Sequence, residues 1–493
     1  MLFSSIPFLF WFLPCVLMLY FIAPRGLKNT VLLLSSLFFY GWGEPRHIVW
    51  MAAAIVLAYL FGLLIERFRE KDKISKLLLT LSVSGSLAML GYFKYGDFLI
   101  DNFNEMTGLS VPLLRMALPI GISFYTFQIL SYTVDVYRGT VAAQRNLVDF
   151  AAYVAFFPQL IAGPIVRYSD VATQLKNRTH SLEGGALGVR RFILGLGKKV
   201  LIANQLGELC SIFRESNDKS VLFFWLYAVA YSLHIYFDFS GYSDMAIGLG
   251  KIFGFRFPEN FHYPYISASI REFWQRWHMS LGSWFRDYVY IPLGGNRVSV
   301  PRHLWNLLVV WMLTGFWHGA AWNFLAWGLY FAFLLIIEKL WLRRKQNRKG
   351  EWGRNRKGRW GRNRKGKWIG NGKGSRIGRH VYVMLMLIIS FVIFDAASVG
   401  QALSYVRAMF GAGGYSLISE EFLYYFRSYG GVLVVAVIGA TPLPKKIWSR
   451  MRTASAGGNL SVFVEPLVIS AILIACTAYL VDASYNPFLY FRF

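Results

Sequence analysis

The chain has 493 residues, of which 55% are apolar and 16% are charged. Soluble globular chains average about a quarter charged residues, so this composition excludes an ordinary soluble domain. The formal net charge of +26 would suit nucleic-acid binding, but residues 343–379 alone carry sixteen Lys and Arg against one Glu. Because over half of the excess charge lies in one loop, no nucleic-acid partner is expected.

Apolar blocks separated by short polar breaks recur along the sequence, as required of helices that cross a hydrocarbon core about 30 Å thick. We therefore predict an all-α, polytopic transmembrane helical bundle. It would have roughly 10–12 crossings plus re-entrant or interfacial helices. The expected helices are residues 6–23, 29–43, 46–65, 76–95, 112–134, 192–213, 221–250, 304–316, 320–342, 380–397, 430–441 and 462–482.

Several connections between these helices are rich in Lys and Arg, which is typical of cytoplasmic loops. The basic connections are residues 67–76, 167–199, 251–302, 343–379 and 445–452, whereas 96–112, 214–220, 398–429 and the tail after 482 have few basic residues. Alternation between the two sides places both termini outside and requires residues 148–164 to be re-entrant or interfacial.

The chain is expected to divide into three parts, and the middle part is a basic loop. Residues 1–342 would form the membrane core, 343–379 the loop, and 380–493 further helices of the same bundle. The loop repeats Asn347-Arg-Lys-Gly-Glu-Trp-Gly-Arg354 with variations. Its glycine and charge predict disorder. It either binds anionic lipid or is an expanded linker that only strengthens the cytoplasmic signal.

An unusual polar segment, Asp238-Phe-Ser-Gly-Tyr-Ser-Asp244, interrupts the apolar run 221–250. Two carboxylates at this depth cannot face lipid. They either form a polar wall of an active-site channel, or the segment serves helix–helix packing, since Ser and Gly permit close contact.

A capping box, Ser269-Ile-Arg-Glu272, predicts a helix start. Apolar and aromatic residues then follow on one helical face as far as Tyr288. We expect one helix that lies at the interface or enters from the cytoplasmic side. His278 would lie at the edge of its apolar stripe, as a functional group or as a hydrogen-bonded interfacial histidine.

His318 lies in Leu313-Thr-Gly-Phe-Trp-His-Gly-Ala-Ala-Trp-Asn323, between two apolar helices. Gly315 and Gly319 would let a ligand approach the backbone closely. Apolar surroundings disfavour the imidazolium form, so a neutral His318 could accept a proton from a hydroxyl. A structural role is the alternative. No metal is expected, because the three cysteines have no metal-ligand spacing.

Several motifs in a fixed order resemble the membrane-bound O-acyltransferases, in particular their AlgI-like and DltB-like bacterial branch. They are Phe257-Pro-Glu-Asn-Phe-His-Tyr-Pro-Tyr265, Glu272-Phe-Trp-Gln-Arg-Trp-His-Met-Ser280, Trp284-Phe-Arg-Asp-Tyr-Val-Tyr-Ile-Pro-Leu-Gly-Gly-Asn-Arg297 and Thr314-Gly-Phe-Trp-His-Gly319. Residues 124–138, 157–164 and 486–493 match as well, so the resemblance covers almost the whole chain except the repeat. Phe331 stands where many relatives have a further histidine.

The resemblance implies that the helical bundle surrounds a central pore, with a donor that arrives from the cytoplasm and an acceptor that arrives from outside. It also implies the cytoplasmic (inner) membrane of a bacterium as the location. The near-invariant histidine of the family aligns with His318, which would be the catalytic base or acyl relay. The second conserved histidine aligns with His278, which would orient or receive the donor. Candidates for orienting the imidazole or binding substrate are Asp238, Asp244, Trp317 and Asn323.

The resemblance further implies transfer of an acyl group, expected to be acetyl, from acetyl-CoA or an acyl carrier protein thioester. The acceptor would be an extracytoplasmic polysaccharide, or a secreted or periplasmic partner protein that acetylates it. Membrane lipid is the remaining partner, and no permanently bound cofactor is expected. The alternatives are D-alanyl transfer to teichoic acid from a carrier protein, and a polysaccharide transporter or channel without covalent chemistry. The sequence has no paired broken helices of the kind found in transporters with internal repeats.

Overall fold

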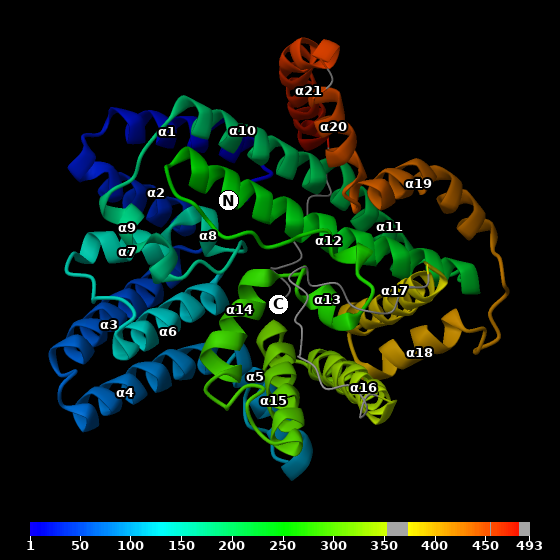
Figure 1. The fold of residues 1–493 in the computed structure, drawn as a ribbon, viewed down its shortest axis with the longest axis horizontal. Coiled ribbons are helices and arrows are strands. Elements are labelled where there is room, and N and C mark those ends of the chain that lie inside the picture. The colour runs from blue at the N-terminus through cyan, green and yellow to red at the C-terminus, as the bar shows by residue number, and fades with distance from the viewer. Residues whose placement is uncertain (353–372, 454, 483–493) are drawn as a thin grey trace.

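The computed structural model describes residues 1–352, 373–453 and 455–482 (Figure 1). These residues form helices and loops without a strand, which confirms the all-α prediction. The N-terminal helices are α1 (Leu13–Ile22), α2 (Lys28–Gly43), α3 (Ile48–Arg67), α4 (Asp72–Leu90), α5 (Gly96–Thr107), α6 (Ile122–Arg138), α7 (Leu147–Ala155), α8 (Phe157–Leu160) and α9 (Tyr168–Lys176). The central helices are α10 (Leu182–Gly197), α11 (Asn204–Glu215), α12 (Val221–Ile252), α13 (Ile270–Trp274), α14 (Met279–Phe285), α15 (Val300–His318) and α16 (Trp322–Trp352). The last helices are α17 (Lys373–Asp395), α18 (Val399–Met409), α19 (Glu420–Gly439), α20 (Leu443–Thr453) and α21 (Ser455–Asp482).

Seven helical segments of the described chain are long and apolar enough to cross a membrane. They lie in α3, α4 with α5, α12, α16, α17, α19 and α21. The multi-pass prediction is confirmed by these segments. The helix expected at 112–134 starts later than predicted: residues 112–121 are not helical, and α6 begins only at Ile122. Pro112 and Pro119 explain the difference, because proline lacks the N–H that a continuous helix needs.

Helix α12 is the central helix of the bundle. Its spanning window is 83% buried, whereas those of α19 and α21 are 6% buried. Helix α10 lies along α12 (Figure 1), and the two backbones approach closely at glycines. A Cβ atom added at Gly195 would lie 2.5 Å from the carbonyl oxygen of Gly241. Part of the segment 238–244 therefore serves helix–helix packing, as small residues commonly do in membranes.

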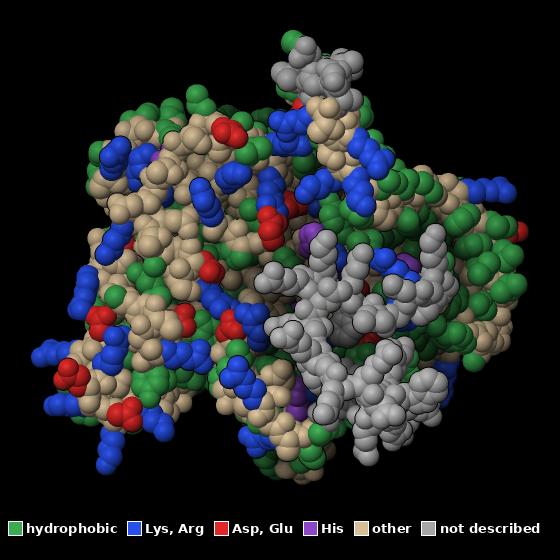
Figure 2. Space-filling model, in the orientation of Figure 1, with side chains coloured by type: hydrophobic (Ala, Val, Ile, Leu, Met, Phe, Trp, Pro, Cys, Tyr) green, Lys and Arg blue, Asp and Glu red, His purple; other side chains and the backbone are tan. Residues whose placement is uncertain are grey.

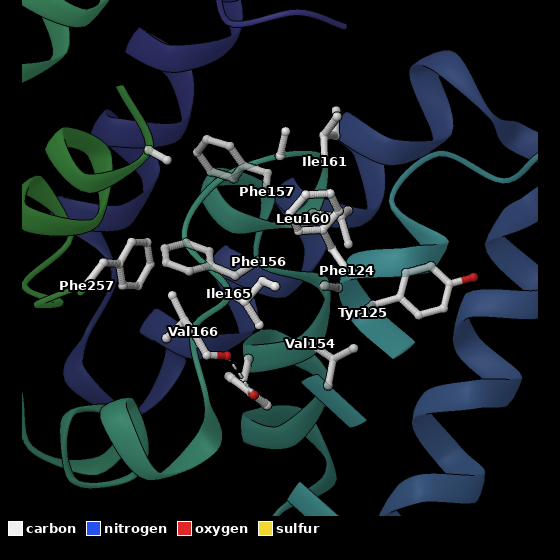
Figure 3. Packing of buried hydrophobic residues seen from close by; sticks show 14 of the residues in the cluster. Phe124, Tyr125, Val154, Phe156, Phe157, Leu160, Ile161, Ile165, Val166 and Phe257 are labelled. Carbon is white, nitrogen blue, oxygen red and sulfur yellow. Dashed lines mark hydrogen bonds between the residues drawn. The ribbon is translucent and has the colours of Figure 1, made fainter. Parts of the chain in front are cut away.

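The segment 148–164 contains two short helices, α7 and α8, which do not span. At 1.5 Å per residue, α7 is only about 14 Å long. Figure 3 shows Phe156, Phe157, Leu160 and Ile161 in a buried cluster with Phe257. This packing fixes the 161–166 turn inside the protein, against the start of α6.

The basic loop is only partly described. Helix α16 continues to Trp352, beyond the expected end at residue 342, and the rest of the repeat lies outside the described residues. Residues 343–352 and 373–379 of the predicted loop are helical, in α16 and α17, contrary to the expected disorder. The expectation for residues 353–372 falls outside the described residues, and so does the motif 486–493. Figure 2 shows many Lys and Arg side chains on the face in view.

Candidate active site

His318 is the last residue of α15, directly before the break that separates α15 from α16. Its side chain is 8% exposed. The rings of Trp317, Trp327 and Phe394 surround it with centroid distances of 5.0, 5.1 and 5.2 Å. Its Nδ1 atom is buried and has no hydrogen-bond partner among the described residues. The expected placement between two apolar helices is confirmed.

Gly315 and Gly319 do not leave room for a ligand, contrary to the expectation from the sequence. A Cβ atom added at Gly315 would lie 2.4 Å from the carbonyl oxygen of Phe324, and one at Gly319 would lie 2.2 Å from the Phe324 ring. The two glycines instead allow the α15–α16 hairpin to close tightly around His318.

His278 lies in a turn between α13 and α14, and not within one continuous helix as expected. Its φ angle is +44°, a left-handed conformation that ends α13 and starts α14. The backbone N–H of Met279 donates to the Asn260 carbonyl at 3.0 Å, and this tertiary contact takes the place of a helical one. His278 is also 2% exposed, so it is a buried residue and not an interfacial one.

Asn260 fixes the tautomer of His278. The side-chain Oδ1 of Asn260 lies 3.0 Å from Nδ1 of His278 and accepts a second hydrogen bond from the Ser280 hydroxyl at 2.8 Å. Because an amide oxygen can only accept, Nδ1 of a neutral His278 carries the proton. Nε2 then holds the lone pair, and this buried atom has no partner among the described residues.

Trp317 lies between the two histidines. Its ring centroid is 5.0 Å from that of His318 and 6.1 Å from that of His278. Its indole Nε1 is also buried without a partner in the described chain. Native proteins leave few buried polar groups unpaired. The neighbouring rings of His278, Trp317 and His318 therefore each carry a buried nitrogen that is available to a polar group of a ligand.

A cavity of about 60 Å³ adjoins His318. Its lining consists of Lys94, residues 118–124, Ile161, Trp317 and His318. Figure 3 shows two of the lining residues, Phe124 and Ile161, at the edge of the buried cluster. The cavity has room for several water molecules, and so for an acetyl group.

Comparisons with known proteins bear on this geometry. The model of the MBOAT, membrane-bound O-acyltransferase family, matches residues 117–354, which include both histidines. The probable alginate O-acetylase AlgI of Pseudomonas putida is 38% identical over an alignment of 511 positions, which covers 100% of each chain. That of Azotobacter vinelandii is 48% identical over 343 residues, 69% of each chain. A peptidoglycan O-acetyltransferase of Helicobacter pylori is 36% identical over 69% of this chain and 70% of its own.

The chain belongs to the membrane-bound O-acyltransferase family. It is therefore an O-acyltransferase, and the resemblance identified from the sequence motifs is confirmed. The family, together with the seven apolar helices found among the described residues, makes it a multi-pass membrane protein.

Three of the other candidate residues of this O-acyltransferase have structural partners. Asp238 pairs with Lys199, and both side chains are buried. Asp244 pairs with Arg191 at 2.8 Å and with Lys198 at 2.6 Å, which joins α12 to α10 and to the helical segment after it.

Asn323 donates to the carbonyl oxygens of Phe394 and Ala396 at 3.2 and 2.8 Å. It thus holds the end of α17, and with it the Phe394 ring that contacts His318.

Two residues beside the histidines were missed in the sequence. Asn260 stands within a family motif, but only the fold shows that it contacts His278. The sequence did contain a signal for Lys94, because this lysine lies near the end of the apolar block 76–95. Ionisable residues at such positions are costly and are functional candidates by default.

Proposed function

We propose that this O-acyltransferase transfers an acetyl group from a cytoplasmic thioester, with His318 as the general base. The acceptor is a hydroxyl of an extracytoplasmic polysaccharide, or a partner protein that acetylates the polymer. The observation that carries the proposal is the set of buried nitrogens on His278, Trp317 and His318 that have no partner in the described chain, because Trp317 and His318 also line the cavity. The relatives named for alginate and peptidoglycan O-acetylation support the acetyl group and the class of acceptor.

The aromatic surroundings of His318 suit a base. Trp317, Trp327 and Phe394 bring no charge that would stabilise an imidazolium. Neutral imidazole removes the proton of the acceptor hydroxyl as its oxygen attacks the thioester carbonyl carbon. The C–S bond then breaks, and the proton passes from the imidazolium to the departing sulfur.

The cavity supplies the acceptor side of this reaction. It is lined by residues 118–124, which follow the connection 96–112 with few basic residues. That connection is expected outside the cell. A polysaccharide hydroxyl would thus reach His318 from the outside, while surrounding aromatic rings exclude water that would hydrolyse the thioester.

His278 takes the donor side. Nε2 carries the lone pair in the tautomer fixed by Asn260, so it can accept a hydrogen bond from an N–H or O–H group of the donor. Acetyl-CoA and an acetylated carrier protein are the two donors considered. Because His278 is only 2% exposed, side chains around it must move before a donor can enter.

The test compares buried histidines of equal size. His318→Gln and His278→Gln are assayed against His234→Gln in α12. His234 is also buried, but it lies outside the family motifs and its Nδ1 contacts the Ala203 carbonyl. The purified proteins in lipid nanodiscs receive acetyl-CoA or an acetylated carrier protein with a polysaccharide acceptor, and released thiol and polymer-bound acetyl are measured. Loss of transfer only in the two site variants is expected, with a fall of about 10²–10⁴-fold for His318→Gln.

Retained transfer in folded His318→Gln would refute the assignment of the base. Thiol release that requires an added partner protein in place of the polymer would show the relayed route. Transfer of D-alanine and not acetyl from a carrier protein would replace the acetyl proposal.

A further inference from the structure

Lys94 brings a positive charge to the same cavity as His318. It lies in a π-helical turn, Gly91–Tyr95, that follows α4. Such wide turns are rare and are frequent at functional sites. Its ammonium group has no carboxylate partner in the described part of the chain. A cation inside a membrane protein is costly unless a partner or ligand compensates it.

The hydrogen bonds of Lys94 leave part of its donor capacity available. Nζ donates to the Trp317 carbonyl at 2.6 Å and to the Ser123 hydroxyl at 3.2 Å. Its third contact, to the His318 carbonyl, is 3.4 Å long. An ammonium has three donors, and good N–H···O bonds are 2.7–3.2 Å long. The third proton can therefore turn to a better acceptor in the cavity.

A second source of positive potential lies next to this ammonium. Helix α6 begins at Ile122, and its first turn, including Ser123, lines the cavity. The start of a 17-residue helix carries partial positive charge and favours anions. The cavity therefore joins a base, a cation and a helix N-terminus, together with the buried, unpartnered Nδ1 of His318.

We propose that Lys94, with the first turn of α6, binds the carbonyl oxygen of the acyl group and stabilises the negative charge that this oxygen gains during transfer. The role of Lys94 during transfer rests on the proposed function, whereas anion binding at Lys94 does not depend on it. When the acceptor oxygen attacks, the electron pair of the C=O bond moves to the carbonyl oxygen. The Lys94 ammonium donates a hydrogen bond to that oxygen until the C–S bond breaks and the carbonyl reforms.

A purely structural role for Lys94 can be separated from this one by its neighbour. Tyr95 belongs to the same turn, and its hydroxyl donates to the Phe316 carbonyl at 2.6 Å. Both residues thus hold the end of α15, but only Lys94 lines the cavity. Tyr95→Phe removes one of these bonds to α15 without changing the charge, and is the matched control for Lys94→Met.

The first experiment measures anion binding without any transfer. Saturation-transfer NMR on the full chain in nanodiscs uses acetate, with acetamide as the neutral probe of the same shape. We expect an acetate signal in the wild type that exceeds the acetamide signal. Lys94→Met should lose this excess, whereas Lys94→Arg, Tyr95→Phe and His318→Gln should keep it. No preference for acetate in the wild type, or an equal preference in Lys94→Met, would overturn the proposal.

The second experiment measures thiol release from acetyl-CoA with the polysaccharide acceptor. Removing one oxyanion donor costs about 10²–10³-fold in kcat, and KM should change little because the contact forms in the transition state. We expect this loss in Lys94→Met, a smaller loss in Ser123→Ala, and near-normal kcat in Tyr95→Phe. Equal losses in Lys94→Met and Tyr95→Phe would mean that both only hold α15. A wild type that binds acetate but releases no thiol would refute the proposed reaction and leave the anion site intact.

Discussion

Replacing Gly315 by Ala tests whether the tight α15–α16 hairpin positions His318. Gly315 lies one turn before His318 and faces α16, where an added Cβ would lie 2.4 Å from the Phe324 carbonyl oxygen and 3.2 Å from Cα of Gly328. Ordinary van der Waals contact starts at 3.4 Å. Since both neighbours are backbone atoms, the methyl group must push the two helices apart by about 1 Å.

The size of the effect follows from this displacement. Overpacking lowers the free energy of unfolding by about 1–3 kcal/mol, whereas replacing a helical glycine by alanine raises it by about 1 kcal/mol. The variant should therefore fold with a modest loss of stability. A misplacement of about 1 Å can cost about 10²-fold in rate, so we expect kcat for acetyl transfer to fall by about that factor.

The assay is thiol release from acetyl-CoA by the purified variant in nanodiscs, with thermal unfolding measured on the same samples. Gly85→Ala is the matched control, because Gly85 lies in α4 and an added Cβ there meets nothing within 4 Å. The control should keep full activity. Full activity in Gly315→Ala at unchanged stability would show that backbone contact between α15 and α16 does not set the position of the base.

The remaining predictions concern the tautomer of His278 and the orientation in the membrane. Asn260→Ala removes the acceptor that fixes the Nδ1–H tautomer, so the rate of transfer should fall by up to about 10²-fold. Asn260→Asp keeps an acceptor oxygen and should keep much of the activity. Equal loss in both variants would contradict the tautomer argument. In a variant without the native cysteines, Leu109→Cys should react with a membrane-impermeant thiol reagent in intact cells, and Glu70→Cys should react only after permeabilisation. The reverse labelling pattern would overturn the orientation, and with it the side from which the acceptor enters.

The class of fold could be predicted from the amino-acid sequence. In lipid, every backbone N–H and C=O group must form its hydrogen bond within its own helix. Each spanning helix therefore corresponds to one continuous apolar block of the sequence. The blocks at 46–65 and 221–250 therefore match α3 and α12 closely. The sequence was less reliable at residues 112–121, where an apolar stretch with two prolines is not helical. The motif around His318 identified the family from local residue order alone.

Which groups meet at the site depends on the packing of the helices and could not be predicted from the sequence. Helical periodicity predicted one helix through His278, but Asn260 binds this residue from 18 positions earlier and turns the chain there. Lys94 reaches the end of α15 from more than 220 positions earlier. The same holds for Lys199 and Asp238, which form an ion pair between neighbouring helices. Contacts of this kind depend on how helices pack against one another, and helix packing is set by side chains far apart in the chain, which no local pattern records.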